Sequence, residues 1–337
     1  MPTITPTKAA VSARITSRRD WLPVVLWTAA VILLAAAAWV RPGAVLPAAR
    51  LSLGPFATLA AIIAGSVLAG RIGLFRALAT ILIPDRAPRP VVAGSVLAFT
   101  ALLAGLANLD VAVVMAMPVA MQAAARHSMP ASRLAAAVAV TANSASFLLP
   151  TSNITSLLLL ERVPLAPLAY LQGSWLAWLL VVTVTVGSLS CWLARAGTGP
   201  AMAGQARPSG RASLDLIPMY VGASSIRAIL AVGITLRGGL AAQLAVGSVL
   251  SCVVNNLPAA AALRPDGTAG LWAAILATAI GPGLLITGSV ATVICRRIGR
   301  ESGAALRAWQ VTAIGLVLVP AQLTAAVIGL HLTGALS

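Results

Sequence analysis

The feature that most constrains this chain is a series of long stretches without a single charged residue. Each one reaches or exceeds the roughly 18–20 residues that a helix needs to cross the hydrocarbon core of a membrane. They cover residues 21–40, 51–70, 134–160, 163–194, 267–295 and 308–337. Only 9% of all residues are charged, against about 25% in an average soluble domain. The sequence therefore excludes a water-soluble globular protein and predicts a polytopic helical membrane protein.

Two apolar windows differ from simple spans because polar residues interrupt them. Residues 91–126 would form a straight helix of about 50 Å, whereas the hydrocarbon core is only about 30 Å thick. Their centre reads GLANLD at 105–110, a combination that breaks helices. Residues 238–264 carry CVVNNLP at 252–258 in the same way. We expect each window to form a re-entrant hairpin.

The distribution of positive charge supports this topology, because cytoplasmic loops of membrane proteins are enriched in Lys and Arg. With both hairpins re-entrant, 17 of the 23 Lys and Arg residues lie inside, five lie outside and Arg227 lies within a span. If either window, or both, is treated as a full span, fewer Lys and Arg residues lie inside and more lie outside. The topology places the N-terminus in the cytoplasm and the C-terminus outside a cell membrane. The net charge of +16 therefore indicates topology and not a nucleic-acid partner.

The sequence also contains an internal repeat. Residues 148–155 (LLPTSNIT) align without gaps with residues 284–291 (LLITGSVA), and each segment follows a hairpin. Because the hairpins enter from opposite faces, the repeats are inverted, as in many secondary transporters. The predicted organisation begins with a cytoplasmic tail (1–20). The first repeat (21–196) contains a hairpin at about 91–126 and an interrupted helix at about 131–161. A cytoplasmic linker (197–213) leads to the second repeat (214–337), which contains a hairpin at about 238–264 and an interrupted helix at about 268–298.

The predicted fold is therefore an all-α integral membrane protein, an inverted-repeat secondary transporter with about eight transmembrane helices plus two re-entrant hairpins.

Asp110 is its one acidic residue away from segment ends. A carboxylate at membrane depth costs several kcal/mol unless it is paired, neutralised or in a wet cavity, so it is a functional candidate. We expect it to bind the coupling proton or a cation. The alternative is a cap that bonds backbone amides at the hairpin tip.

Other polar residues cluster at the four interruptions, where broken helices supply free carbonyls and amides for ions or anionic groups. The predicted substrate or ion site consists of Asn108, Asp110, Asn143, Thr151, Ser152, Asn153, Asn255, Asn256, Thr287 and Ser289. The alternative is that these side chains only satisfy one another. Arg227 attracts an anion, pairs with Asp110 or reaches the membrane interface, and we favour the interface.

Metal, cofactor and enzyme chemistry receive no support from the motifs. The three cysteines show no CxxC or CxxxH spacing, so we expect neither zinc nor a disulfide framework. An intramembrane hydrolase is the alternative with catalytic chemistry, but the chain has neither GxSxG nor HExxH. We expect a transporter that has no cofactor and is not an enzyme.

Four ordered motifs resemble a known family, the ArsB-like arsenite/antimonite efflux permeases of the ion transporter superfamily. LDVAVV at 109–114 looks like the first hairpin tip, and VNNLP at 254–258 is similar to the second. ANSAS at 142–146 with PTSNIT at 150–155 resembles the first interrupted helix. GP at 281–282 with TGSVAT at 287–292 resembles the second.

This resemblance implies a transport core that moves against a scaffold, usually within a homodimer, and proton-coupled efflux of arsenite or antimonite. Near neutral pH arsenite is largely the uncharged trihydroxide, which amides and hydroxyls can bind without a counter-charge. The expected partners are thus a small inorganic substrate, a coupling proton or sodium ion and the lipid bilayer. An ATPase subunit is left open, as is the homodimer.

Two other functions remain as alternatives. A sodium/proton antiporter of the same superfamily, or another small-ion permease, would also use an acid beside amide and hydroxyl oxygens. A non-transporting membrane subunit descended from a permease belongs to a different class. The short scaffold, with only about 214–236 before the second hairpin, suggests this second alternative.

Overall fold

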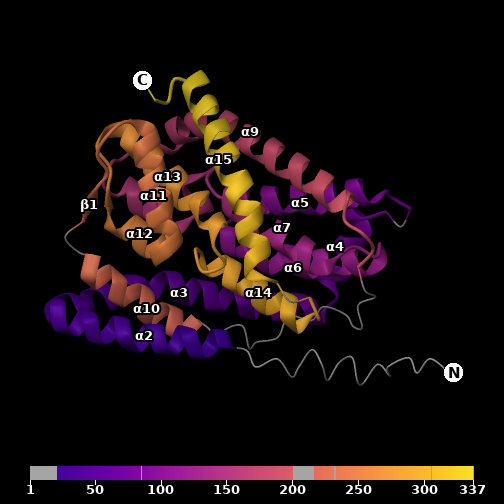
Figure 1. The fold of residues 1–337 in the computed structure, drawn as a ribbon, viewed down its shortest axis with the longest axis horizontal. Coiled ribbons are helices and arrows are strands. Elements are labelled where there is room, and N and C mark those ends of the chain that lie inside the picture. The colour runs from indigo at the N-terminus through magenta and orange to yellow at the C-terminus, as the bar shows by residue number, and fades with distance from the viewer. Residues whose placement is uncertain (1–20, 85, 200–215, 231–232, 305, 337) are drawn as a thin grey trace.

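The computed structural model is almost entirely helical (Figure 1). It describes residues 21–84, 86–199, 216–230, 233–304 and 306–336. The predicted tail (1–20) and positions 200–213 of the predicted linker lie outside the described residues. All the elements named below belong to the described part of the chain.

The elements before the linker include both arms of the first predicted hairpin and both parts of the first interrupted helix. They are α2 (Trp21–Val40), α3 (Pro42–Arg71), α4 (Leu74–Leu82), α5 (Arg89–Leu106), α6 (Leu109–Arg126), α7 (Ala131–Ser144), the short helix η1 (Pro150–Ser152), α8 (Ile154–Leu160) and α9 (Pro167–Ala194).

The elements after the linker follow the same order. They are α10 (Leu216–Ile229), β1 (Ile234–Thr235), α11 (Leu240–Val254), α12 (Asn256–Ala262), β2 (Leu263–Arg264), α13 (Gly267–Ala279), η4 (Gly281–Leu284), α14 (Val290–Glu301) and α15 (Ala308–Leu332). The two-residue strands β1 and β2 pair in parallel, with Ile234 opposite Leu263.

Six of the described helical segments are long and apolar enough to cross a membrane, and a bent pair in α3 and α4 would add a seventh. The protein is therefore all-α and has the helices of a multi-pass membrane protein. This count differs from the predicted eight spans plus two hairpins. The arms of the first hairpin, α5 and α6, have 18 residues each and qualify separately, whereas α10 and α11 have only 14 and 15 residues and do not qualify.

Helix ends coincide with the polar interruptions. Asn108 lies between α5 and α6, and Asn255 lies between α11 and α12. The opposite end of the first hairpin is closed by a hydrogen bond from Arg89 Nε to the His127 carbonyl oxygen (3.3 Å). The first hairpin therefore has basic residues at its open end, where α5 begins and α6 ends, and Asn108 at its tip.

Corresponding helices make corresponding contacts in the two halves. Helices α5, α6 and α7 pack together, as do α11, α12 and α13. Across the halves, α14 packs on α6 and α7, while α8 packs on α12 and α13. The second part of each interrupted helix therefore lies against the hairpin and first part of the other half. This arrangement brings all four interruptions toward one place.

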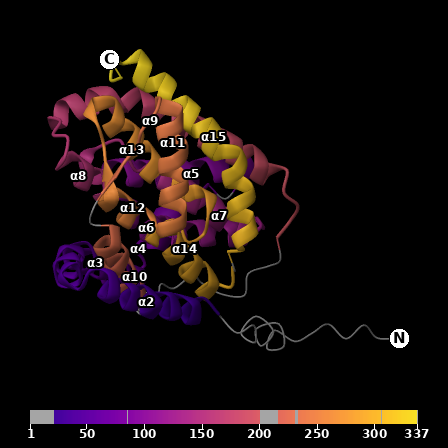
Figure 2. The ribbon, with the colours of Figure 1, turned by 60° about the vertical axis from the view of Figure 1, so that its left-hand side comes forward.

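A separate group of helices is formed by α2, α3 and α10, which lie side by side along one edge (Figures 1 and 2). Tyr220 of α10 joins α3 through two contacts. Its hydroxyl donates to the Ala49 carbonyl oxygen (3.0 Å), and its ring packs edge-on against Phe56 at 5.5 Å between centroids. The group contacts the rest of the protein where α3 meets α6 and α10 meets α12.

Helices α9 and α15 form the longest packed pair, and α15 is the last helix of the described chain (Figure 1). Gln322 of α15 is fully buried and donates to Thr185 Oγ1 of α9 (2.8 Å). Small residues allow the two backbones to approach closely, as is typical of helices in membranes. Gly329 lies directly against Ala177 at the closest point.

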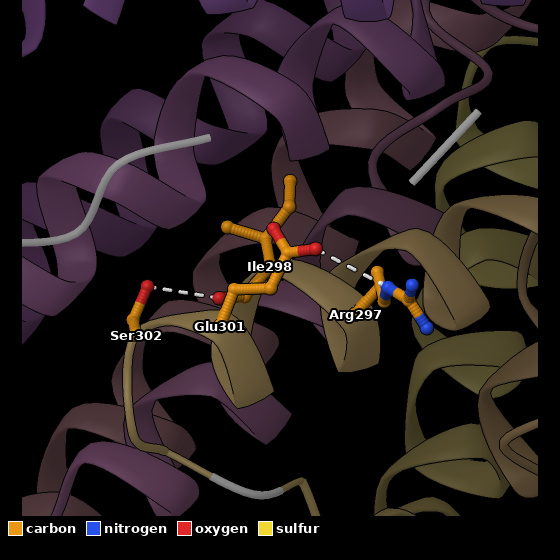
Figure 3. A network of polar contacts seen from close by, with 4 residues as sticks. All are labelled: Arg297, Ile298, Glu301 and Ser302. Carbon is orange, nitrogen blue, oxygen red and sulfur yellow. Dashed lines mark hydrogen bonds and ion pairs between the residues drawn. The ribbon is translucent and has the colours of Figure 1, made fainter. Parts of the chain in front are cut away.

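Helix α14 ends in a polar network (Figure 3). Arg297 Nε forms an ion pair with Glu301 Oε1 at 3.2 Å, one helical turn away. Ser302 Oγ donates to the Ile298 carbonyl oxygen (2.8 Å). Arginine in the last turn also favours the negative end of the helix dipole. The end of α14 distant from the interruption is therefore suited to the membrane surface.

The α9–α15 contact gives a first test. A Cβ at Gly329 would lie 2.3 Å from Ala177 Cα, whereas a Cβ at Gly187 of α9 meets nothing within 4 Å. We expect Gly329→Ala to lower stability by about 1–3 kcal/mol through overpacking. Gly187→Ala should be neutral or stabilising by up to about 1 kcal/mol. Thermal unfolding in detergent checks both, and equal behaviour of the two variants would contradict the packing.

Candidate functional site

A cavity of about 40 Å³ lies where the four interruptions meet. This volume exceeds the roughly 10–15 Å³ that a cavity needs to hold one water molecule, so the cavity has room for water or a very small solute. Its lining comes from the first turns of α6, α8, α12 and α14, with Phe56 of α3 added. The lining residues are Phe56, Leu109, Asp110, Asn153, Ile154, Thr155, Asn256, Leu257, Val290 and Ala291.

Each of these four helices begins at the cavity with a side chain that caps its backbone. Asn108, Asn153 and Asn255 each accept a hydrogen bond from the amide two residues further on, at 2.8, 3.1 and 3.4 Å respectively. Ser289 accepts from the Thr292 amide (3.3 Å). Asn and Ser are preferred at this position because they satisfy amides that have no helical partner. The caps explain why polar residues occur at these positions in apolar sequence.

In the first half, the hairpin tip is bonded to the interrupted helix. Asn108 Nδ2 donates to the Thr151 carbonyl oxygen (3.3 Å). Ser152 Oγ donates to the Gly105 carbonyl oxygen and accepts from the Leu149 amide. Ser152 is fully buried, so its hydroxyl is already used within the protein.

The second half repeats this arrangement. Asn255 Nδ2 donates to the Thr287 carbonyl oxygen (3.1 Å), and the aligned segments place Thr287 opposite Thr151. The Asn256 amide donates to the Gly288 carbonyl oxygen (2.9 Å). In both repeats, the hairpin tip is therefore joined to the break of the interrupted helix by equivalent hydrogen bonds.

Two further contacts join one half to the other. Asn143 Nδ2 of α7 donates to Thr292 Oγ1 of α14 (3.0 Å). Thr278 Oγ1 of α13 lies 3.4 Å from Thr155 Oγ1 of α8. All four side chains are almost fully buried. In each contact, the helix before the break in one half (α7 or α13) meets the helix after the break in the other half (α14 or α8). The two contacts therefore hold the two helix breaks beside each other.

Asp110 carries the only ionisable group in the cavity lining. It lies in the first turn of α6, where the positive end of the helix dipole favours a carboxylate. Its carboxylate has no hydrogen bond or ion pair with any described residue, so the alternative pairing with Arg227 is absent from the structure. The equivalent position in the second hairpin is Leu257, which also lines the cavity. The charge therefore belongs to one repeat alone.

The structure brings only part of the predicted set to the cavity. Asp110, Asn153 and Asn256 line it directly. Asn108, Ser152, Asn255 and Ser289 hold the helix starts around it. Thr151 and Thr287 have exposed side chains and contribute carbonyl oxygens to the tip contacts. Asn143 lies behind the lining, bonded to Thr292, and its Oδ1 has no partner among the described residues.

Several lining residues were absent from the predicted set. Thr155 and Val290 occur in the repeated segments, and the rule that a capped helix begins at an interruption could have included them. Phe56 lies far away in sequence, in an apolar run without polar residues. No pattern in the sequence distinguishes Phe56 from the other apolar residues of α3.

The second hairpin tip has an unusual backbone conformation. Asn255 has φ +81° and ψ 149°, a region in which residues other than glycine are strained. Asn108 at the first tip has φ −170°, which is ordinary extended backbone. The two tips therefore make equivalent contacts with unequal backbone strain.

The chemistry available at the cavity is binding by amides and hydroxyls, together with proton exchange at one carboxylate. Among the described residues, no group of three or more His, Cys, Asp or Glu side chains could hold a metal ion. No family model matches the chain, and no curated protein matches its sequence. The resemblance to arsenite/antimonite permeases therefore stays a prediction from the motifs.

The strained cap at Asn255 gives a second test. Asn255→Ala removes the cap and the bond to the Thr287 carbonyl while keeping a Cβ at positive φ, so it should lower stability by about 1–2 kcal/mol. Asn255→Gly loses the same contacts but relieves the backbone, and should cost less. Thermal unfolding of both variants in detergent checks the order. A glycine variant less stable than the alanine variant would contradict it.

Proposed function

We propose that the protein is a secondary active transporter that exports arsenite or antimonite in exchange for protons by alternating access. The observation that carries this proposal is the meeting of all four helix interruptions at one small cavity that contains a single carboxylate. A purely structural polar cluster would not need a cavity or an unpaired carboxylate. Transporters with repeated interrupted helices bind their solute at such a place.

The proposed topology has seven crossings. Six are made by α2, α3, α7 with α8, α9, α13 with α14, and α15, and the seventh is assigned to the segment around α10, whose 14 described residues are by themselves shorter than a span. An N-terminus inside and a C-terminus outside require an odd number of crossings, so the expected number of about eight is corrected to seven. Three crossings separate the hairpins, which then enter from opposite faces. The re-entrant assignment is supported by the contact of the first hairpin tip with the middle of the first interrupted helix.

The lining favours an uncharged or anionic oxygen-bearing solute over a hard cation. Leu109 and Val290, the first residues of α6 and α14, belong to the lining, and the first amides of a helix have no partner within the helix. Helix N-termini carry partial positive charge and donate hydrogen bonds, which suits solute oxygens and opposes sodium. Arsenic and antimony trihydroxides offer such oxygens without a net charge. This lining is the reason for ranking them above sodium.

Asp110 is assigned the coupling proton. In the outward-facing state the carboxylate takes up a proton, and in the inward-facing state it releases the proton to the cytoplasm while the site takes up the solute. The carboxylate is therefore neutral on the inward step and ionised on the outward, solute-loaded step, where the positive end of the α6 dipole favours its charge. The proposal also includes location in the cell membrane and leaves a homodimer open. The non-transporting alternative predicts that Asp110 can be replaced without effect on any transport.

The primary test compares Asp110→Asn with Asp266→Asn, the same change at an exposed acid before α13. In metalloid-sensitive cells, wild-type protein and Asp266→Asn should lower arsenite and antimonite accumulation. Asp110→Asn should restore accumulation to the level of cells without the protein, because it cannot carry the proton. Radiometric or mass-spectrometric measurement of cell-associated arsenic and antimony provides the result, with surface expression matched by immunoblot.

The same variants separate the alternatives. Efflux by Asp110→Asn that still responds to a proton gradient would reject the single-acid mechanism. No metalloid efflux together with sodium-dependent proton movement in everted vesicles would identify the antiporter. Neither activity in correctly inserted wild-type protein would favour the non-transporting subunit.

A further inference from the structure

A second and larger hollow lies away from the interruptions, between α9 and α15. Its volume is about 330 Å³, at the lower end of the range for small-molecule sites. We call it the α9–α15 groove. Its walls are the last turns of α9, the first three turns of α15 and one residue of α7, Arg133.

The groove changes from polar to apolar along α15. Trp309 and Gln310 line it in the first turn, and Val317 and Leu318 line it two turns further on. This separation corresponds to about 12 Å along the helix. Val317 is 73% exposed and its neighbour Leu316 is 64% exposed, so the apolar part opens on a surface that must face hydrocarbon in a membrane protein. The groove is therefore amphipathic and open at its side.

Arg133 lies at the polar end without an anionic partner. Its guanidinium carbon is 5.2 Å from the centre of the Trp192 ring, a cation–π contact. No described Asp or Glu forms an ion pair with it. Gln310 is also at this end; it is 6% exposed and its Oε1 has no hydrogen-bond partner among the described residues. A positive charge and an unsatisfied amide thus meet at the end of an apolar groove.

The level of this end in the membrane follows from its aromatic residues. Trp192 and Trp309 are adjacent to helix ends marked by Arg195 and Arg307. Tryptophan is enriched where lipid headgroups meet hydrocarbon, and basic residues mark the cytoplasmic side. The polar end of the groove is therefore expected at the cytoplasmic headgroup region, and the apolar end deeper in the bilayer.

From this geometry we propose that the α9–α15 groove binds one anionic phospholipid, with its phosphate at Arg133 and an acyl chain along Ala313 and Val317. A headgroup hydroxyl, as in phosphatidylglycerol, supplies the donor that Gln310 lacks once the amide turns toward it. Basic pockets between membrane helices on the cytoplasmic side bind anionic headgroups in this way. A soluble anion would use Arg133 but leave the apolar part unfilled. The proposal does not depend on which solute the protein transports.

The test uses the full chain purified in detergent and then supplied with phosphatidylglycerol, phosphatidylcholine or inorganic phosphate. Native mass spectrometry should show one retained phosphatidylglycerol, and only this lipid should raise the unfolding temperature. Arg133→Gln should weaken its retention by about tenfold or more, the size expected for loss of a charge-assisted contact. Ala313→Trp should block retention by filling the groove while leaving the arginine in place.

The matched control is Arg71→Gln, which removes an exposed arginine at the end of α3 and should retain the lipid. Size-exclusion profiles confirm folding, and Ala313→Trp keeps the test decisive if Arg133→Gln misfolds. Equal retention of phosphatidylcholine would overturn the proposal. So would an equal stabilisation by inorganic phosphate, or retention unaffected by both groove variants.

Discussion

The structure depends on the need to satisfy backbone amides and carbonyls wherever a helix is interrupted away from water. Hydrocarbon supplies no hydrogen bonds, so irregular backbone is tolerated only where protein or a cavity satisfies it. Here one Asn or Ser caps each helix that restarts, and the two hairpin-tip asparagines also donate to the adjacent break. The residues that solve this backbone problem are the same ones that surround the cavity. In the proposed transporter, the side chains that hold the helix starts would therefore also position the solute site.

This double use explains how the two halves can be equivalent in construction and different in chemistry. The tip contacts of Asn108 and Asn255 match, but the residue two positions later is Asp110 in one half and Leu257 in the other. The carboxylate consequently faces the cavity from one repeat only. Of the two tip asparagines, Asn255 alone has a positive φ. In the proposed transporter, unequal repeats would hold different conformations, as alternating access requires.

The sequence predicted the class of fold and the positions of the interruptions, because both depend on local composition. Uncharged runs indicate spans, and Asn, Gly and Pro within them indicate breaks. The positions of Asn153 and Asn256 at the cavity followed from the same pattern. Phe56 could not be predicted, since its place depends on how α3 packs against the core. Likewise, the exposed side chains of Thr151 and Thr287 follow from loop geometry that the repeat does not specify.

The single carboxylate also limits the energetics of the proposed cycle. With Asp110 as the one ionisable group in the lining, that group carries at most one proton each time the site changes access. Exchange of an uncharged trihydroxide for one proton moves one net positive charge into the cell. A membrane potential that is negative inside then contributes about 2.3 kcal/mol per 100 mV, in addition to the pH gradient. A neutral solute would thereby be driven outward by both components of the proton gradient, even though it responds to neither by itself.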